Sequence, residues 1–328
     1  MKTTFIFILI LGLFFSCETA KKENHATSVT HTTSKDTIHS KEAKTVKLAS
    51  GKLMRVVDFP SNYIRPRNVD VWLPENYSKD KKYNVLYMHD GQMLYDASTT
   101  WNKQEWQVDE VASMLMREGK TQDFIVVSPW NISEIRWQDY FPQKAFDYLN
   151  EEAKKSLLVK TKENNFEVVF SADNYLKFLT EELKPYIDKT YSVKTHREHT
   201  HVAGSSMGGL ISMYAMCEYP EIFGAAACIS THWVGMLTPM ENNPIPNAFF
   251  VYMSEKIPSP TTHKFYFDYG TKTLDRHYPQ YAEIIDKIFK KKGYSKINYR
   301  NLRFEGADHS ENSWQKRLHI LLTFLLKK

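Results

Sequence analysis

The sequence predicts an α/β protein built on a mostly parallel, doubly wound sheet. From about residue 46 onward, short apolar runs alternate with longer segments of helical periodicity. Some of these runs, such as 124–127, are apolar at every position, which is typical of strands covered by helices on both faces. A hydrophobic content of 42% is enough for a packed core. Alternating strands and helices favour this architecture over a bundle or a sandwich.

The predicted elements follow one another in a regular order. Strand-like runs lie at 54–59, 69–73, 84–88, 124–128, 200–203, 225–229, 264–269 and 297–304, and helical patterns at 108–117, 172–190, 210–218, 278–292 and 313–326. No helix separates the first two strands, so we expect an antiparallel hairpin there. The charged segment 143–171 interrupts the pattern. It is either a lid over the carboxyl ends of the strands, where ligands bind in such sheets, or a surface loop.

The first 17 residues form a separate unit. A positive start is followed by an apolar run from 5 to 15, which is shorter than the roughly 20 residues that span a bilayer. The run fits the apolar region of a secretory signal. Ser16-Cys17 resembles a bacterial lipoprotein cleavage site, where Cys17 becomes lipidated. We therefore expect an exported protein, lipid-anchored to a bacterial membrane on its periplasmic or cell-surface side. An ordinary signal peptide or a short anchor helix are the alternatives.

Residues 18–45 are rich in Lys, Thr, Ser, Glu and His and poor in large apolar side chains. Such a segment buries too little surface to offset its ordering entropy, so we expect a flexible tether before a domain at 46–328. The net charge is +5, and the basic residues are scattered along the chain with acidic residues among them. The absence of a clustered basic face argues against a nucleic-acid partner. Cys217 and Cys228 are expected to be buried free thiols.

The main catalytic signal is the segment Gly204-Ser205-Ser206-Met207-Gly208-Gly209. It lies between a predicted strand and a predicted helix, which is the context of a nucleophile elbow. We expect Ser206 on a tight, strained turn, with glycine two residues before and two after because side chains there would clash. The backbone N–H of Met207, at the start of the helix, is expected to help hold an oxyanion.

A general base and an acid follow Ser206 in the order that such a serine centre uses. The base is predicted to be His309, in the loop between the last strand and the last helix. His232 and His89 are its rivals. Asp275, beyond the end of strand 264–269, is the predicted acid. Asp268 and Asp308 are the alternatives to Asp275.

The remaining site residues are predicted from their places after strands. The loop after strand 84–88 carries Gly91 and Gln92, and the Gln92 N–H is the second candidate oxyanion donor. The candidate substrate-binding residues are Trp130, Arg136, His232 and Trp233, with Trp101 as a further loop aromatic. For each aromatic, ordinary packing is the alternative.

These segments together resemble the putative esterase family, whose members include esterase D-type enzymes, enterochelin esterases, carbohydrate esterase family one and mycolyltransferases. The matching residues are His89-Asp90-Gly91-Gln92, Trp106-Gln107-Val108-Asp109, the turn at Ser206, Tyr269-Gly270-Thr271 with Asp275, and Gly306-Ala307-Asp308-His309 with Trp314. The resemblance covers roughly residues 50–328. It implies an α/β-hydrolase fold and an acyl-enzyme mechanism that needs no metal or cofactor.

Three functions remain open from the sequence. The first is a serine esterase acting on acylated polysaccharide or a related extracytoplasmic ester of feruloyl or acetyl type. The second is a siderophore esterase of the enterochelin type. The third is a catalytically silent binding protein with the same fold, which the complete set of Ser206, Asp275 and His309 argues against.

Overall fold

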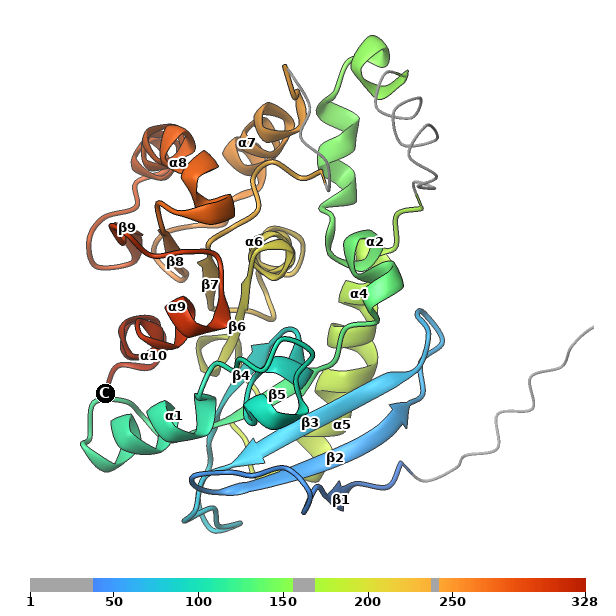
Figure 1. Ribbon diagram of the computed structural model, residues 1–328, viewed down its shortest axis with the longest axis vertical. Coiled ribbons are helices and arrows are strands. Elements are labelled where there is room, and N and C mark those ends of the chain that lie inside the picture. The colour runs from blue at the N-terminus through green and yellow to red at the C-terminus, as the bar shows by residue number, and fades with distance from the viewer. Residues whose placement is uncertain (1–37, 156–168, 237–241) are drawn as a thin grey trace, which may run out of the picture. The chain divides into compact units, whose positions relative to one another are not determined.

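The computed structural model describes residues 38–155, 169–236 and 242–328. Within them a nine-stranded sheet runs in the order β1-β2-β3-β5-β4-β6-β7-β8-β9 (Figure 1). The strands are β1 (Lys41–Glu42), β2 (Lys52–Phe59), β3 (Arg67–Leu73), β4 (Asn84–Met88), β5 (Phe124–Pro129), β6 (Thr200–Ser205), β7 (Ala225–Ile229), β8 (Lys264–Tyr269) and β9 (Tyr299–Arg303).

Six neighbouring strands, from β5 to β9 in the sheet order, pair in parallel. The other pairings, β1 with β2, β2 with β3 and β3 with β5, are antiparallel. The predicted hairpin and the mostly parallel sheet are therefore confirmed. The described domain also includes residues 38–45 of the expected tether, because Lys41 and Glu42 pair with β2 and the Ala43 N–H donates to the Leu53 carbonyl at 2.8 Å.

Helices cover both faces of the sheet. They are α1 (Val108–Arg117), α2 (Arg136–Tyr140), α4 (Ala172–Lys177), α5 (Lys184–Thr190), α6 (Met207–Glu218), α7 (Ile245–Lys256), α8 (Pro279–Lys291), α9 (Glu311–Gln315) and α10 (Leu318–Leu326). The predicted helix at 172–190 is present but contains a π-helical turn, η5 (Phe178–Leu183). Pro185 follows this turn and has no N–H to donate to the preceding turn.

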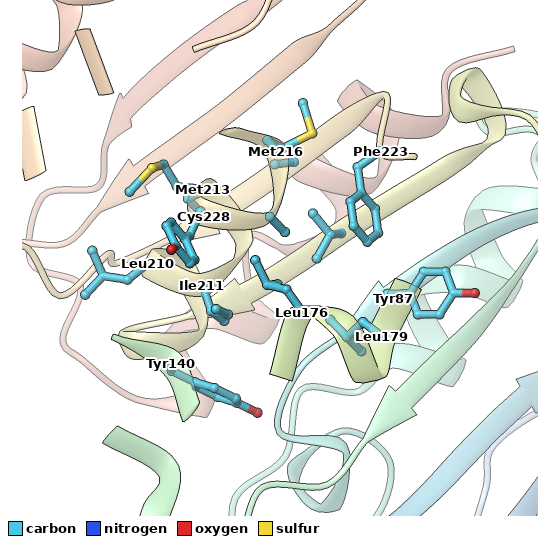
Figure 2. Packing of buried hydrophobic residues seen from close by; sticks show 14 of the residues in the cluster. Tyr87, Tyr140, Leu176, Leu179, Leu210, Ile211, Met213, Met216, Phe223 and Cys228 are labelled. Carbon is cyan, nitrogen blue, oxygen red and sulfur yellow. The ribbon is translucent and has the colours of Figure 1, made fainter. Parts of the chain in front are cut away.

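Side chains alternate along each strand between two cores. Val85 and Tyr87 of β4 face the larger core, which α4, α5, α6, α7 and α8 cover, whereas Leu86 and Met88 face the core under α1 and α10. This is the period-2 alternation of a strand between two apolar layers. Every residue from Met207 to Cys217 in α6 is buried. Figure 2 shows the surroundings of α6, with Ile211, Leu176 and Leu179 among the labelled residues of the larger core.

Other elements also differ from the sequence prediction. The helix expected at 313–326 is broken into α9 and α10 at Lys316 and Arg317. Helix α7 was not predicted, because its run Phe249–Met253 is apolar and rich in strand-forming residues. Part of segment 143–171 forms a 3-10 turn, η4 (Gln143–Tyr148), that packs against α7. Residues 156–168, in the expected lid, lie outside the described residues.

Cys217 in α6 and Cys228 in β7 are buried free thiols, as predicted. No helix among the described residues is long and apolar enough to cross a membrane. The expected signal segment at 1–17, with Cys17, lies outside the described residues.

Candidate active site

Ser206 lies between β6 and α6 in a strained backbone conformation, with φ 58° and ψ −122°. This region is costly for a residue with a side chain and is found where the surrounding structure enforces it. The Ser206 N–H donates to the Ile229 carbonyl of β7 at 2.9 Å, which fixes the turn to the neighbouring strand. This is the strand-turn-helix geometry of a nucleophile elbow.

Two glycines near Ser206 are required by close approach: Gly204, as the sequence indicated, and Gly209 in place of Gly208. A Cβ on Gly204 would lie 2.7 Å from the Gly208 carbonyl oxygen, and one on Gly209 would lie 2.8 Å from Thr231 Oγ1. A Cβ on Gly208 would meet nothing closer than Asp90 Oδ2 at 3.4 Å, an ordinary contact. The expectation that a side chain at Gly208 would clash is therefore wrong.

Asp275 and His309 are brought together beyond the ends of β8 and β9. Their side chains form a hydrogen bond of 2.5 Å between His309 Nδ1 and Asp275 Oδ1. Asp275 is fully buried, and the His309 side chain is 13% exposed. A carboxylate only accepts hydrogen bonds, so Nδ1 carries the proton and Nε2 is the basic nitrogen. The pair is therefore arranged as the acid and base of a serine centre.

The alternative acids have other partners. Asp268 accepts hydrogen bonds from Arg317 at 3.0 Å and from the Tyr266 hydroxyl at 2.9 Å. Asp308 accepts from Ser310 at 2.6 Å and from Ser313. Neither carboxylate bonds to His309, so among these three candidates Asp275 alone contacts the imidazole through a hydrogen bond.

The alternative bases are also engaged elsewhere. His232 accepts from the Tyr278 hydroxyl at Nδ1 (2.9 Å) and donates from Nε2 to the Met236 carbonyl (3.0 Å). Burial lowers its pKa to about 4, partly offset by the Met236 carbonyl. His89 bonds to the Tyr175 hydroxyl at 2.9 Å, and burial lowers its pKa to about 4 as well. Both imidazoles are neutral at pH 7.

Ser206 and His309 share neighbours. The His232 N–H donates to the Ser206 carbonyl at 3.1 Å, and Tyr278, which holds the His232 ring, has its own ring 6.0 Å from that of His309. The His309 N–H donates to Thr273 Oγ1 at 2.9 Å, and Thr273 lines the same cavity as Ser206. No hydrogen bond joins these two described residues, Ser206 and His309, to each other. Such bonds are often long in a free enzyme and tighten around the substrate.

The two predicted oxyanion donors lie at the ends of adjacent strands. The His89 N–H donates to the Ala203 carbonyl at 3.0 Å, which holds the loop after β4 beside the loop after β6. Within the described residues, neither the Met207 N–H nor the Gln92 N–H has an acceptor, and Met207 is the first residue of α6. A Cβ on Gly91 would lie 2.3 Å from the Ser128 carbonyl, so glycine permits the loop to approach β5 closely.

Arg136, a predicted substrate-binding residue, lines the cavity but is already paired. Its Nε donates to Asp90 Oδ1 at 2.8 Å and a terminal nitrogen donates to Oδ2 at 2.7 Å. Asn131 donates to Asp90 Oδ1 at 2.7 Å. Burial alone would raise the pKa of Asp90, but the charge and hydrogen bonds of Arg136 outweigh it and lower that pKa.

A cavity of about 970 Å³ opens at Ser206. Its walls come from the loop after β7, α7, the turn η7 (Thr273–His277) and α8. Phe250, Tyr281 and Leu274 supply apolar surface, and His232, Arg276 and Asn243 supply polar groups. The cavity is large enough for a substrate of drug-like or disaccharide size.

Two of the predicted substrate contacts do not line this cavity. Trp233 is 4% exposed and packs against Phe250 and Phe267 in the core. Trp130 donates to Asp70 Oδ2 at 2.9 Å, and the guanidinium of Arg55 lies 4.6 Å from its ring. Both residues follow strands, as predicted, but their side chains contact other residues instead of lining the cavity.

Comparison with known proteins shows which family this chain belongs to. The model of the family described as "Putative esterase" matches residues 61–325. The chain belongs to the putative esterase family. A bifunctional endo-1,4-β-xylanase/feruloyl esterase of Xylanibacter ruminicola is 24% identical over 84% of this chain. That match spans only 32% of the relative's length.

Solved structures show that this esterase has the α/β-hydrolase fold. A ferulic acid esterase from Anaeromyces mucronatus matches 87% of this chain and 95% of its own, with a TM-score of 0.55 and 19% identity. An enterobactin esterase from Shigella flexneri matches 86% of this chain and 61% of its own, with a TM-score of 0.60 and 13% identity.

One part of the esterase's site was missed by the sequence analysis. Ser230, the first residue after β7, donates to Asp275 Oδ2 at 2.5 Å and accepts from both Trp314 Nε1 and Arg317. Only Trp314 had been noted, as part of a matching segment. Ser230 has φ 41°, a strained backbone conformation at the carboxyl end of a central strand. This strain marks Ser230 in the structure, but the sequence alone does not reveal it.

Proposed function

We propose that this family member is a serine esterase that cleaves carboxylic esters through an acyl-enzyme on Ser206. The hydrogen-bonded pair of Asp275 and His309, at the same sheet edge as the strained Ser206 turn, is the observation that carries the proposal. The order serine, carboxylate, histidine along the chain (Ser206, Asp275, His309) agrees with that of the α/β-hydrolase fold.

In the first half-reaction, Ser206 Oγ attacks the ester carbonyl carbon while its proton passes to His309 Nε2. The carbonyl oxygen becomes an oxyanion, which the free N–H groups of Met207 and Gln92 are available to bind. The C–O bond to the alcohol then breaks, and the departing oxygen takes the proton from His309. Asp275 stabilises the imidazolium that exists between the two proton transfers.

In the second half-reaction, water attacks the acyl carbon and gives a proton to His309. The tetrahedral species collapses, the bond to Ser206 Oγ breaks, and the serine takes the proton back. The products are the free carboxylic acid and the regenerated enzyme. Because α6 begins at Met207, its positive end also favours the anionic stages.

For the substrate, we propose an acylated polysaccharide or a related ester of feruloyl or acetyl type. The cavity carries Phe250 and Tyr281, which suit an aromatic or sugar ring. Trp101 is 84% exposed on a loop bonded to the segment after His309, through Asn102 and Glu311 at 2.9 Å. The relatives named as feruloyl esterases are consistent with this class.

A siderophore esterase is the second candidate, and one feature of the cavity favours it. Arg276 lines the cavity without an ion pair to any described carboxylate, and no acidic residue is among the described lining residues. An unpaired guanidinium suits an anionic catecholate. The enterobactin esterase neighbour is consistent with this alternative.

A substrate panel decides between these functions. Purified full-length protein, Ser206→Ala and Ser254→Ala are assayed with p-nitrophenyl acetate, methyl ferulate, acetylated xylan and a catecholate trilactone. Ser254, an exposed serine of α7, is the matched control. We expect activity in the wild type and the control, and loss of about 10⁴-fold or more in Ser206→Ala. Activity that survives in Ser206→Ala would exclude the mechanism, and preference for the trilactone would exclude the polysaccharide ester.

We also propose that the protein is exported and anchored through lipid on Cys17. The apolar run before Ser16-Cys17 supports this assignment. Mass analysis of the mature N-terminus, with Cys17→Ser as control, should show a diacylated or triacylated cysteine. An unmodified N-terminus beyond residue 17 would indicate an ordinary signal peptide.

A further inference from the structure

The geometry points to Ser230 and Arg317 as positioning residues that hold the Asp275 carboxylate oriented toward His309. This inference rests on the proposed serine esterase mechanism. It concerns a buried hydrogen-bonded chain that runs from Arg317 through Ser230 and Asp275 to His309.

The direction of each hydrogen bond in this chain is fixed by chemistry. The guanidinium of Arg317 and the indole of Trp314 can only donate, and both point at Ser230 Oγ, at 2.8 Å and 3.0 Å. A serine hydroxyl accepts two hydrogen bonds and donates one. With both acceptor positions filled, its single proton is directed to Asp275 Oδ2 at 2.5 Å. The short distance is that of a charge-assisted bond from a hydroxyl to a carboxylate.

Asp275 is therefore held from two sides. Oδ2 accepts from Ser230 and from the Gly270 N–H at 2.6 Å, which leaves Oδ1 to face His309. Ser230 and Asp275 are both fully buried, so water does not compete for these bonds. Donors on Oδ2 stabilise the ionised carboxylate, which is the form that must orient the imidazole.

Arg317 reaches this position because of the break between α9 and α10. It is 2% exposed, and one terminal nitrogen donates both to Ser230 and to Asp268 Oδ1 at 3.0 Å. A continuous helix over 313–326 would place residue 317 differently. Trp314 in α9 bonds to Ser230, and its ring packs edge-to-face on the His309 ring at 5.0 Å.

Among the described residues, the titratable and charged groups near Asp275 lie on two sides of it. They are His309, His232 and Tyr278 on the cavity side, and Arg317, Asp268 and Tyr266 behind Ser230. Removing the Ser230 donor or the Arg317 charge leaves more unbalanced negative charge on Asp275. The imidazolium form of His309 is then favoured, so the basic imidazole is lost at a higher pH during acidification.

Three variants test this chain. Ser230→Ala removes the donor to Asp275. Arg317→Met combined with Asp268→Asn removes the buried charge without leaving an unpaired carboxylate. Ser230→Cys keeps a weaker donor at the same place. Ser192→Ala is the control, because Ser192 is also buried and donates to the Lys79 carbonyl, in a segment the mechanism does not use.

The measurements are kcat and KM for p-nitrophenyl acetate from pH 5 to 9, normalised to active serine by fluorophosphonate titration. For Ser230→Ala we expect kcat to fall about 10- to 100-fold, the range for losing a hydrogen bond to a charged group. KM should change less than about two-fold. In the pH profile of kcat, the acidic limb should shift to higher pH by at least about half a pH unit. The double variant removes one positive and one negative charge, so we expect it to lower kcat through loss of the Arg317 contact to Ser230, with a smaller shift of the acidic limb than Ser230→Ala. Ser230→Cys should lie between Ser230→Ala and the wild type.

The inference is overturned if folded Ser230→Ala or the double variant keeps the wild-type kcat per active serine and the wild-type pH profile. A loss explained only by fewer titratable active sites, with the pH profile unchanged, overturns it as well. A wild type and Ser192→Ala that hydrolyse no ester and take up no fluorophosphonate would instead refute the proposed function, so the two failures are distinguishable.

Discussion

Arg136 binds Asp90 through two parallel hydrogen bonds, from Nε to Oδ1 at 2.8 Å and from a terminal nitrogen to Oδ2 at 2.7 Å. The pair joins α2 to the loop after β4, where Gln92 offers a free N–H. The second proposed oxyanion donor is therefore positioned by an ion pair rather than by the sheet alone.

Arg136→Lys should lower kcat for small esters about 10-fold, because an ammonium cannot reproduce the two-point guanidinium contact that orients the loop. Kinetics with p-nitrophenyl acetate measure this. Arg55→Lys is the matched control, since Arg55 binds Asp70 by the same two-point geometry at 2.6 and 2.8 Å in the β2–β3 hairpin. Equal effects in both variants would show that the Arg136 contact has no special role.

Gly204→Ala and Gly208→Ala should behave in opposite ways. The new methyl at 204 would lie 2.7 Å from the Gly208 carbonyl, and overpacking of this kind costs about 1–3 kcal/mol. At 208 the nearest atom is 3.4 Å away, and alanine favours the helix by about 0.5–1 kcal/mol over glycine.

Urea unfolding and active-serine titration of the two variants check this difference. We expect a lower midpoint and fewer active sites for Gly204→Ala, and a midpoint at or above wild type for Gly208→Ala. A destabilised Gly208→Ala would contradict the described spacing at the start of α6.

The limits of sequence prediction are visible in this turn. The order strand, Ser206, helix is local and could be predicted, because it depends on the spacing of a few residues along the chain. Which glycine is sterically required depends on what approaches it, and at Gly209 that neighbour is Thr231 of the next strand's loop. A contact between segments that are distant in sequence leaves no local pattern.

The same distinction, between a local pattern and a contact of distant segments, explains which predicted site residues were placed correctly from the sequence. Asp275 and His309 follow successive strands of a parallel sheet, so topology alone brings their loops to one edge. Trp233 follows a strand as well, yet its ring packs into the core, because side-chain direction is set by packing. Arg317 lies within a predicted helix, and only the tertiary structure shows the break that turns it toward Ser230.

Stability should fall steeply as the pH drops from about 6.5 toward 4. Burial lowers the pKa of His89 to about 4, of His201 to about 3 and of His232 to about 4. The folded state therefore binds fewer protons than the unfolded state in this window, and protonation favours unfolding. Asp109 opposes this effect, because burial raises its pKa to about 7 and the folded state then binds one proton more than the unfolded state at that carboxyl. Three protons in one direction and one in the other correspond to a net slope of up to about 3 kcal/mol per pH unit.

Urea midpoints measured from pH 8 to pH 4 test this dependence. His201→Gln should reduce the net slope by up to about one-half, because it removes one of the three buried imidazoles whose pKa is lowered while the opposing proton on Asp109 remains. His319→Gln is the control, since His319 is exposed on α10. A slope unchanged in His201→Gln would show that the buried imidazole does not contribute.

Trp101→Ala should separate polymeric from small substrates. Trp101 is 84% exposed, and its loop is tied to the segment after His309 by Asn102 with Glu311 (2.9 Å) and by Gln104 with the Asn312 N–H (3.3 Å). An exposed indole on a fixed loop suits stacking against a sugar ring, and such exposed apolar surface commonly marks a binding site.

We expect kcat/KM of Trp101→Ala on acetylated or feruloylated xylan to fall about 5- to 10-fold, consistent with loss of one aromatic contact of about 1 kcal/mol. Activity on methyl ferulate and the urea midpoint should not change. Ile297→Ala, which removes an 85% exposed side chain near the opposite end of β9, should leave both activities intact. If Trp101→Ala weakens both substrates equally, the indole acts on the site itself, and if it weakens neither, the polysaccharide does not extend over this loop.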